Sequence, residues 1–158
     1  MLKRKFEDFE RNWRQSFSNG LEHPLAKKSA LKHAYWIDHE VLRQFYHNAH
    51  EIAKNVFRSN QPSPKRVKYW WGKGVRTIIN FRGESSQAAY FLERDACKEL
   101  GIELIDYKLF ATKLVKPEVI LNLEQIFKDI EKPFLMHCKS GSDRAGLGSA
   151  LYFIFIMK

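Results

Sequence analysis

Residues 137–144 read His-Cys-Lys-Ser-Gly-Ser-Asp-Arg, so that a cysteine and an arginine enclose five residues with a glycine among them. The apolar run at 134–136 follows a proline and predicts a buried parallel strand. Residues 145–157 are apolar nearly all round, which is typical of a buried helix. A strand, a tight loop and a helix in this order favour oxyanion binding. The loop N–H groups are expected to turn inward, and the positive end of the helix dipole points at the same spot.

The residue types in this loop indicate nucleophilic chemistry on phosphorus. A helix N-terminus and a nearby guanidinium lower the pKa of a cysteine thiol from about 8.5 to roughly 3.5–7.5. We therefore expect Cys138 to be a thiolate at neutral pH. Arg144 offers a planar fork of donors that matches two phosphate oxygens. The predicted reaction is attack by Cys138, a phosphocysteine intermediate and hydrolysis by water. Loop amides and Arg144 would stabilise the charge on the equatorial oxygens.

The loop HCKSGSDRAG resembles the signature loop of the cysteine-dependent protein tyrosine and dual-specificity phosphatases. It is similar to a bacterial subgroup with the pattern His-Cys-x-x-Gly-x-Asp-Arg, whose members act on phosphotyrosine and sometimes on phosphoinositides. Residues 57–64 resemble the first strand of these bacterial enzymes, and residues 75–84 their first core strand. The resemblance covers residues 35–158. It implies a phosphatase-like α/β fold, with Lys139, Ser140, Gly141 and Ser142 lining the phosphate site.

Two positions of the loop depart from the family pattern. Residue 145 is Ala, where most of the family has a Ser or Thr hydroxyl that helps the intermediate break down, which predicts slower turnover. Ser140 or Ser142 is the candidate to replace that hydroxyl. Ser142 also stands where the subgroup often has Lys, which weakens the phosphoinositide interpretation; Lys139 is the remaining loop cation.

The leaving oxygen needs a proton donor, and two aspartates are candidates. The subgroup resemblance favours Asp143, inside the loop. In the wider family the acid lies some thirty residues before the cysteine, where Asp106 stands, but the alternating residues 102–109 predict a strand there rather than a mobile loop. Residues 110–113 contain no acid. The structural alternative for Asp143 is that its carboxylate caps helix N–H groups.

Two further residues have simpler interpretations. We expect His137 to hold the loop by hydrogen bonding rather than to act as an acid or base. Cys97 is expected to face the core from a helix, with redox pairing to Cys138 as the alternative. Arg82 and Glu84 follow a strand, and we favour a structural role for them over a place at the rim of the site.

Length, charge and cysteine content set the class of protein. A chain of 158 residues forms one domain. We expect an N-terminal segment at 1–34 and a catalytic domain at 35–158 that is truncated or covered by a partner at its end. Residues 1–76 hold 16 Lys and Arg against 7 Asp and Glu, and the remainder is neutral. This excess favours phosphoproteins, phospholipid headgroups or an anionic membrane surface as partners. No nucleic-acid, metal or cofactor motif is present, and two cysteines without a signal peptide predict a cytoplasmic protein.

The remaining periodicity predicts alternating helices and strands. Leu2, Phe6, Phe9, Trp13 and Phe17 form one face of a basic helix, which we expect to pack on the domain, with an anionic membrane as the alternative. Residues 21–34 are predicted to be a basic connector and 34–53 partly helical, with Asp38 as an N-cap. Further helices are expected at 63–72, 85–100 and 117–130, and strands at 77–81 and 102–109. The alternation implies an α/β fold with a mostly parallel central sheet flanked by helices.

The sequence thus predicts a cofactor-free phosphoric monoester hydrolase, most simply a protein tyrosine or dual-specificity phosphatase. The alternatives are a phosphoinositide or phospholipid phosphatase, a non-catalytic phosphate-binding module and a sulfurtransferase. Persulfide-forming loops usually have one residue fewer before the arginine, which argues against the last.

Overall fold

The computed structural model describes residues 2–17, 21, 23–36, 46–110, 112–113 and 115–157. The described helices are α1 (Leu2–Gln15), α2 (Pro24–Trp36), α4 (Pro64–Gly72), α5 (Ala88–Leu100), α6 (Pro117–Asp129) and α7 (Asp143–Ile156). The described strands are β1 (His50–Ala53), β2 (Val56–Ser59), β3 (Thr77–Asn80), β4 (Glu103–Asp106) and β5 (Phe134–His137). The alternation of strands and helices from β2 onward confirms the predicted α/β class.

One sheet organises the molecule, with strand order β1-β2-β5-β3-β4. β5 is parallel to β2 and β3, β4 is parallel to β3, and β1 is antiparallel to β2. Ser59, His137, Asn80 and Asp106, the last residues of four parallel strands, lie in register across the sheet. The carboxyl ends of these strands therefore meet at one edge, and the mostly parallel sheet is confirmed.

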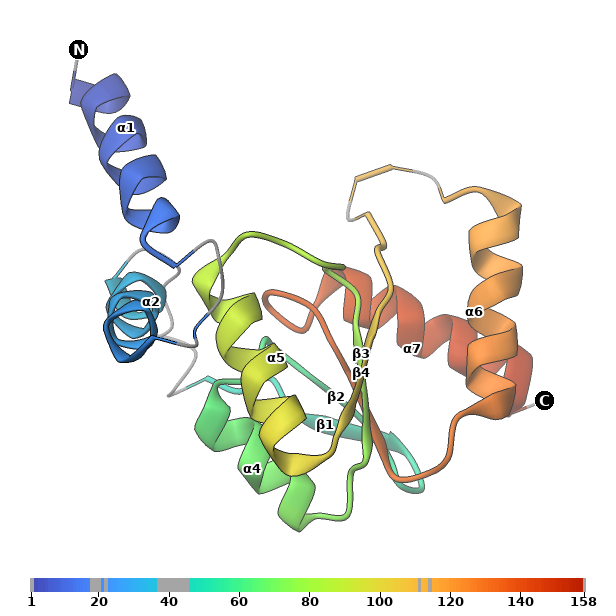
Figure 1. Cartoon of the computed structure of the whole chain (residues 1–158). Coiled ribbons are helices and arrows are strands. Elements are labelled where there is room, and N and C mark those ends of the chain that lie inside the picture. Colours follow the sequence, from blue (N-terminus) through green and yellow to red (C-terminus); the bar gives the residue numbers. More distant parts are fainter. Residues whose placement is uncertain are drawn as a thin grey trace.

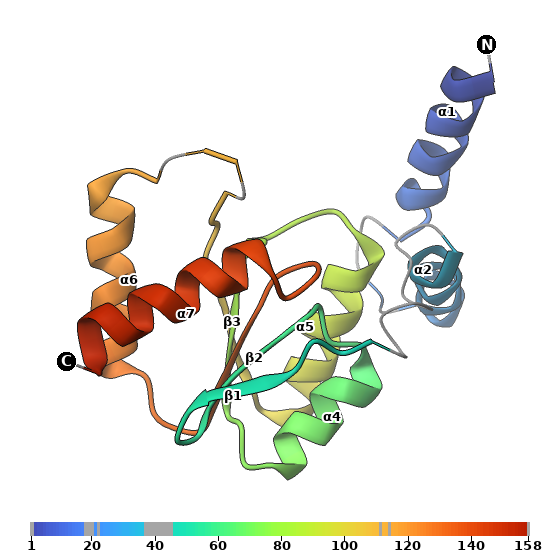
Figure 2. The same ribbon diagram turned by 180° about the vertical axis from the view of Figure 1, so that it is seen from behind.

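Helices cover both faces of the sheet, α4 and α5 on one and α6 and α7 on the other (Figures 1 and 2). β5 shows why, because alternate residues of a strand point to opposite faces. Phe134 and Met136 belong to the core formed with α6 and α7, whereas Leu135 belongs to the core formed with α4 and α5. All of these side chains are fully buried. Burial on both faces accounts for the continuous apolar run of this strand.

The predicted connector at 21–34 is wrong, since residues 24–36 form α2. Pro24 stands at the start of the helix, where the missing N–H costs nothing. Ala30 and Ala34, four residues apart on one face, are fully buried in the same cluster as Phe91 of α5. Small side chains let two helices approach closely, and the spacing of these alanines was the signal for the helix.

Other boundaries also differ from the sequence-based expectation. Asp38, the expected N-cap, lies outside the described residues, and residues 50–53 form β1 rather than the end of a helix. α5 starts at Ala88 with Gln87 as N-cap, later than expected. The strand predicted at 102–109 is confined to β4. It ends at Asp106 because the neighbouring strand β3 ends at the same level and no longer supplies a continuous set of backbone hydrogen bonds. Residues after Asp106 make only isolated backbone bonds, such as that from the Leu109 N–H to the Phe81 carbonyl at 3.1 Å.

The first helix packs on the domain through its C-terminal end. α1 projects away from the sheet in both views (Figures 1 and 2). Phe6 and Phe9 are 54% and 57% exposed, whereas Phe17, just beyond the helix, is buried against Phe91 of α5. Trp13 donates its indole N–H to the Ser29 hydroxyl at 3.0 Å. The expectation that the whole apolar face packs is therefore correct only near Trp13 and Phe17.

Candidate active site

The cysteine loop joins the central strand to α7. β5 ends at His137 and α7 begins at Asp143, so Cys138 to Ser142 form the whole connection. The loop lies at the carboxyl edge, where open parallel sheets place their ligands. The first turn of α7 presents unpaired N–H groups and the positive end of its dipole there. The order strand, loop and helix is confirmed, but the expectation of a buried helix is only partly correct, because Phe153 and Ile154 of α7 are 45% and 54% exposed.

Gly141 allows the loop to lie against the end of β2. Its φ is +76°, in the left-handed region that residues with a side chain rarely adopt. A Cβ atom at this position would lie 2.7 Å from the carbonyl carbon of Ser59 and 2.8 Å from the backbone nitrogen of Asn60. Both the backbone conformation and the close approach therefore require glycine.

Two neighbouring segments hold the loop by its carbonyl groups. The side-chain amide of Asn48 donates to the Ser140 carbonyl at 2.9 Å, and the backbone N–H of Gln61 donates to the Lys139 carbonyl at 3.3 Å. Among the described residues no group accepts a hydrogen bond from the backbone N–H of Ser140 or Gly141. The loop is thus fixed through acceptors, while these two donors remain for an anion.

The predicted site residues are gathered in this one loop and the first turn of α7. Cys138 is 1% exposed and Arg144 is half-buried; the exposed members are Lys139, Ser140, Ser142 and Asp143. Within the described chain no carboxylate pairs with Arg144 and no cation pairs with Asp143. The guanidinium is therefore available to an anion. Because Cys138 is shielded from bulk water, nearby charges and dipoles act on it more strongly than they would in solvent.

Asp106, the second candidate acid, is held in place at the end of β4. Its carboxylate accepts hydrogen bonds from the Asn80 side-chain amide and from the Tyr90 hydroxyl, both at 2.7 Å. Burial, followed by this bond to Asp106, raises the pKa of Tyr90. Asn80 lies between Asp106 and His137 in the sheet, which separates the backbones of the two outer residues by roughly 10 Å. These two hydrogen bonds tie the Asp106 carboxylate to β3 and α5.

The two cysteines lie on opposite faces of the sheet. Cys97 belongs to the core beneath α4 and α5, as expected, and Cys138 to the core beneath α6 and α7. Neither forms a disulfide. Burial, then the negative charges of Glu93 and Asp106, raise the pKa of the Cys97 thiol. Cys97 is therefore an inert core residue, and the sheet separates it from Cys138.

A chain of buried polar side chains supports the loop from the α5 face. His137 Nε2 lies 2.8 Å from Glu93 Oε1, and both side chains are fully buried. The Gln61 side-chain amide donates a short hydrogen bond to the other oxygen of Glu93, and the Gln61 side-chain oxygen Oε1 accepts one from Arg82 at 2.7 Å. The supporting role expected of His137 agrees with this placement. Sequence reasoning missed Glu93 and Gln61, although a lone acid among the apolar positions of a helix was a signal.

Because residue 145 is Ala, the first turn of α7 lacks the hydroxyl that is common at this position in the phosphatase family that the loop resembles. Ala145 is fully buried. The next hydroxyl along this side of the helix, that of Ser149, donates to the Ala145 carbonyl at 2.7 Å. Ser149 is thus bonded within the helix, and the loop hydroxyls of Ser140 and Ser142 are the ones beside Cys138 in the chain.

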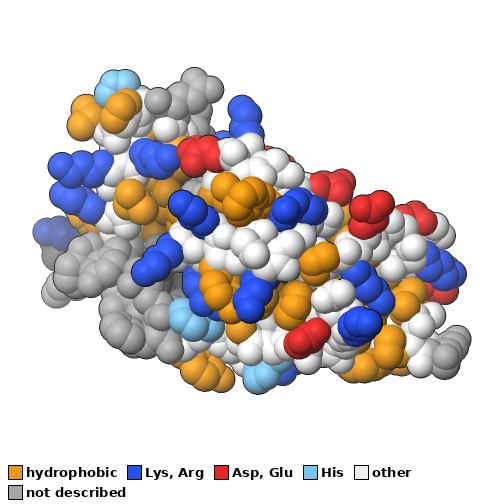
Figure 3. All heavy atoms as spheres, turned by 90° about the horizontal axis from the view of Figure 1, so that it is seen from below, with side chains coloured by type: hydrophobic (Ala, Val, Ile, Leu, Met, Phe, Trp, Pro, Cys, Tyr) orange, Lys and Arg blue, Asp and Glu red, His pale blue; other side chains and the backbone are white. Residues whose placement is uncertain are grey.

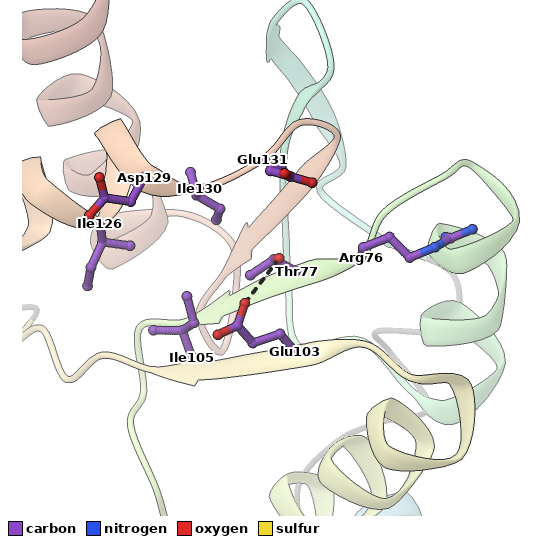
Figure 4. A pocket seen from close by; sticks show the side chains of 8 residues that line it. All are labelled: Arg76, Thr77, Glu103, Ile105, Ile126, Asp129, Ile130 and Glu131. Carbon is purple, nitrogen blue, oxygen red and sulfur yellow. Dashed lines mark hydrogen bonds between the residues drawn. The ribbon is translucent and has the colours of Figure 1, made fainter.

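A cavity of about 350 Å³ lies at the opposite, amino edge of the sheet (Figure 4). Thr77 and Glu103, the first residues of β3 and β4, line it together with Ile126, Asp129 and Glu131. Figure 4 shows the carboxylates pointing in different directions rather than toward one centre. The cavity holds none of the loop residues and is separate from the cysteine site.

Curated proteins with a similar sequence are phosphatases. The chain is 26% identical over 110 residues to the dual specificity protein phosphatase TpbA of Pseudomonas aeruginosa, an alignment that covers 69% of this chain and 47% of TpbA. The chain therefore spans about half the length of that relative. The crystal structure of TpbA superimposes with a TM-score of 0.58 at 25% identity, over 70% of this chain and 65% of the crystallised one.

More distant structures share the fold. The core catalytic domain of the PP-IP phosphatase SIW14 from S. cerevisiae superimposes with a TM-score of 0.56 at 18% identity, over 66% of this chain and 63% of that one. The family described as DSP-PTPase phosphatase fused to NAD+ kinase matches residues 38–152, which include both the supporting β2 segment and the cysteine loop. With this match over most of its length, the chain belongs to that DSP-PTPase family of cysteine-based phosphatases.

Proposed function

We propose that this chain hydrolyses phosphotyrosine, with phosphoserine and phosphothreonine as further substrates, through a phosphocysteine on Cys138. The observation that carries the proposal is the Cys138–Arg144 loop at the carboxyl edge of the sheet, held by its carbonyls, with the N–H groups of Ser140 and Gly141 unbonded within the described residues. The catalytic unit in this proposal is residues 35–158. The free cysteines support a reducing, cytoplasmic setting.

In the first step the Cys138 thiolate attacks phosphorus and the bond from phosphorus to the ester oxygen breaks. Arg144 and the loop amides, including that of Gly141, hold the equatorial oxygens as their charge changes. The leaving oxygen takes a proton from Asp143, which stands exposed at the start of α7. The products of this step are the free alcohol and phosphocysteine.

In the second step water attacks the phosphocysteine. The Asp143 carboxylate accepts a proton from the water, the bond between sulfur and phosphorus breaks, and inorganic phosphate leaves. The thiolate is restored, so the cycle consumes one water and needs no redox partner. Since Ala145 supplies no hydroxyl, we expect this step to be slow and phosphocysteine to accumulate.

The substrate class is tested by comparing phosphotyrosyl, phosphoseryl and phosphothreonyl peptides of one sequence. A further crystal structure of TpbA contains phosphotyrosine, which supports phosphotyrosine as the preferred substrate. We expect kcat/KM to be highest for the phosphotyrosyl peptide. A Cys138→Ser protein should bind that peptide without turnover, and equal, absent hydrolysis by both proteins would instead support a phosphate-binding module.

A second candidate substrate is the headgroup of an anionic phospholipid, favoured by the exposed face of α4. This face carries the following residues: Lys65, Arg66, Lys68, Tyr69, Trp71 and Lys73. Tyr69 and Trp71 are 45% and 40% exposed, and α4 contains no acid. Seen from below, Lys and Arg side chains surround hydrophobic ones on this side of the molecule (Figure 3). Cations interspersed with interfacial aromatic residues suit an anionic membrane surface.

The start of α4 lies near the catalytic loop, whereas its end, with Trp71 and Lys73, lies toward the start of β5. Pro64, the first residue of α4, follows Gln61, whose N–H holds the loop at the Lys139 carbonyl. Among the described helices none has the length and apolar character needed to cross a bilayer, so contact through α4 would be peripheral.

Vesicle sedimentation and a phosphoinositide panel test the lipid candidate. Replacing Lys65, Lys68 and Lys73 together with Glu should weaken binding to phosphatidylserine vesicles by roughly a hundredfold, since each basic residue contributes about 1 kcal/mol. Lys116→Glu, at the start of α6, is the control. Equal binding by wild type and both variants, with no lipid turnover, would exclude this candidate.

A further inference from the structure

A buried carboxylate stands next to the histidine that precedes the nucleophile. Glu93 and His137 are both fully buried, and Glu93 Oε1 lies 2.8 Å from His137 Nε2. Neither of these two atoms has a hydrogen-bond partner in the described part of the chain. Burying an ionised carboxylate without compensation is very costly, so each group depends on the charge of the other.

The remaining contacts of Glu93 favour its ionised form. The Glu93 Oε2 atom accepts a hydrogen bond from the Gln61 side-chain amide, which supplies donors of fixed orientation. Arg82 donates to the other end of the same Gln61 side chain at 2.7 Å, which brings a positive charge to the outer side of the pair. Hydrogen bonds to the charged form of a carboxylate stabilise that form.

The imidazole is in contact with this carboxylate and is joined to the nucleophile through the backbone. His137 is adjacent to Cys138 in the chain, and its Nδ1 atom lies 3.4 Å from the Cys138 carbonyl oxygen. A doubly protonated ring can donate to that carbonyl and face Glu93 at the same time, whereas a neutral ring has one donor. In such an ion pair the positive member belongs to the residue that precedes Cys138, whereas the negative member stands on α5.

Other charged groups near the pair do not replace this arrangement. On α5, Cys97 lies one turn beyond Glu93. The Tyr90 hydroxyl, also on α5, donates to the Asp106 carboxylate. In the sheet, Asn80 of β3 lies between Asp106 and His137 and bonds the Asp106 carboxylate. On the other side of the loop Arg144 and Asp143 begin α7. The contact at 2.8 Å is the direct link between a charged residue of α5 and the cysteine loop.

We propose that Glu93 is a positioning residue that keeps His137 protonated and oriented, and that the resulting imidazolium favours the thiolate form of Cys138. This inference rests on the proposed phosphocysteine chemistry. It adds to that chemistry a source of thiolate stabilisation on the α5 side, opposite the dipole of α7 and Arg144.

The test replaces Glu93 with Gln, which preserves shape and removes charge. The rate of alkylation of Cys138 by iodoacetamide is measured against pH, with the modified peptide identified by mass spectrometry. We expect the midpoint of the Glu93→Gln profile to rise by about one pH unit, so that alkylation below the midpoint slows about tenfold. Glu99→Gln, an exposed acid on the same helix that pairs with Lys27, should keep the wild-type midpoint.

Two further variants separate charge from structure. Glu93→Asp keeps the carboxylate and should lie closer to wild type than Glu93→Gln. In a His137→Asn background, Glu93→Gln should no longer shift the midpoint, because the imidazole that transmits its effect is absent. Circular dichroism and thermal melting identify any variant that does not fold, in which case the Glu93→Asp profile carries the test.

Specific outcomes overturn the proposal. An unchanged midpoint in folded Glu93→Gln would make the residue merely structural. A lowered midpoint would show that Glu93 acts as a bare negative charge beside a neutral histidine. Failure of the phosphatase proposal is recognised separately, as absent turnover in wild-type protein whose Cys138 still shows a normal alkylation profile.

Discussion

The two faces of the sheet carry one cysteine each, in opposite electrostatic settings. Cys97 lies in α5, where burial and two carboxylates raise the pKa of its thiol. Cys138 lies at the carboxyl edge, beside the first turn of α7 and Arg144. Both side chains are 1% exposed. Burial is thus common to both thiols, and the proposed difference in reactivity requires the nearby charges and dipoles to differ in sign.

The largest expected effect comes from exchanging sulfur for oxygen at each site. Cys138→Ser should abolish hydrolysis of p-nitrophenyl phosphate, because a serine hydroxyl without a base is a poor nucleophile. Cys97→Ser should retain activity within about twofold, since nothing in the proposed mechanism uses it. Steady-state kinetics of the two purified variants, with melting curves as a check on folding, measure the difference. Residual turnover in Cys138→Ser would remove the distinction between the faces.

The next effect concerns proton transfer at the loop. Asp143→Asn should lower kcat for phenyl phosphate by on the order of 10³-fold, with a smaller loss for p-nitrophenyl phosphate, whose leaving group needs no proton. The wild-type rate should fall as rising pH deprotonates the acid, and the variant should lack this basic limb. Asp106→Asn is the matched control: it breaks the bonds to Asn80 and Tyr90 and should reduce stability while leaving the limb in place. Loss of the limb in the control instead would assign the acid to Asp106.

The loop backbone gives a third comparison, between two glycines. Gly141→Ala places a Cβ 2.7 Å from the Ser59 carbonyl carbon at a left-handed φ, so the loop must move. A displacement of about 1 Å at a catalytic group typically costs about 10²-fold in rate, and we expect that loss in kcat/KM. A Cβ at Gly72, at the end of α4, meets nothing within 4 Å, so Gly72→Ala should be active. Comparable activity in the two variants would mean that the loop tolerates a different backbone.

The smallest effect is on alkaline stability and belongs to the α5 face. Because the native pKa of Cys97 is raised above its ordinary value of 9.0, the unfolded chain loses this proton first. Stability is thus complete below pH 9 and falls above it by up to about 1.4 kcal/mol per pH unit. The raised pKa of Tyr90 adds a fall of the same sign above pH 10. Urea unfolding of wild type and Cys97→Ala at pH 8, 9 and 10 should show a gentler fall in the variant; parallel curves would contradict the assignment.

Local patterns predicted the features that depend on neighbouring residues in the chain. The apolar run of β5, the Cys138–Arg144 spacing and the apolar α7 together predicted a loop at the carboxyl edge of a parallel sheet. A proline at the first turn correctly predicted the start of α4 and of α6. These signals work because strand burial, helix initiation and oxyanion binding each need particular residue types at short separations.

Features that depend on packing between distant segments were missed. Residues 21–34 were predicted to be a basic connector because their lysines dominate the local composition, whereas the alanines that pack near α5 give only a weak apolar pattern. Glu93 of α5 meets both Gln61 and His137 only because the pairing of β2 with β5 brings the ends of these strands to one edge. Propensity carries no information on that register, although the acid within an apolar stripe of α5 could have been noted.

The most direct test of the account is to trap the intermediate. Wild-type protein is mixed with excess p-nitrophenyl phosphate, quenched in acid during turnover and digested, and the peptides containing Cys138 and Cys97 are compared by mass spectrometry. The account predicts one added phosphoryl group on the Cys138 peptide, none on the Cys97 peptide, and no adduct at all in Cys138→Ser. Steady turnover with neither cysteine phosphorylated, or an adduct on Cys97, would contradict it.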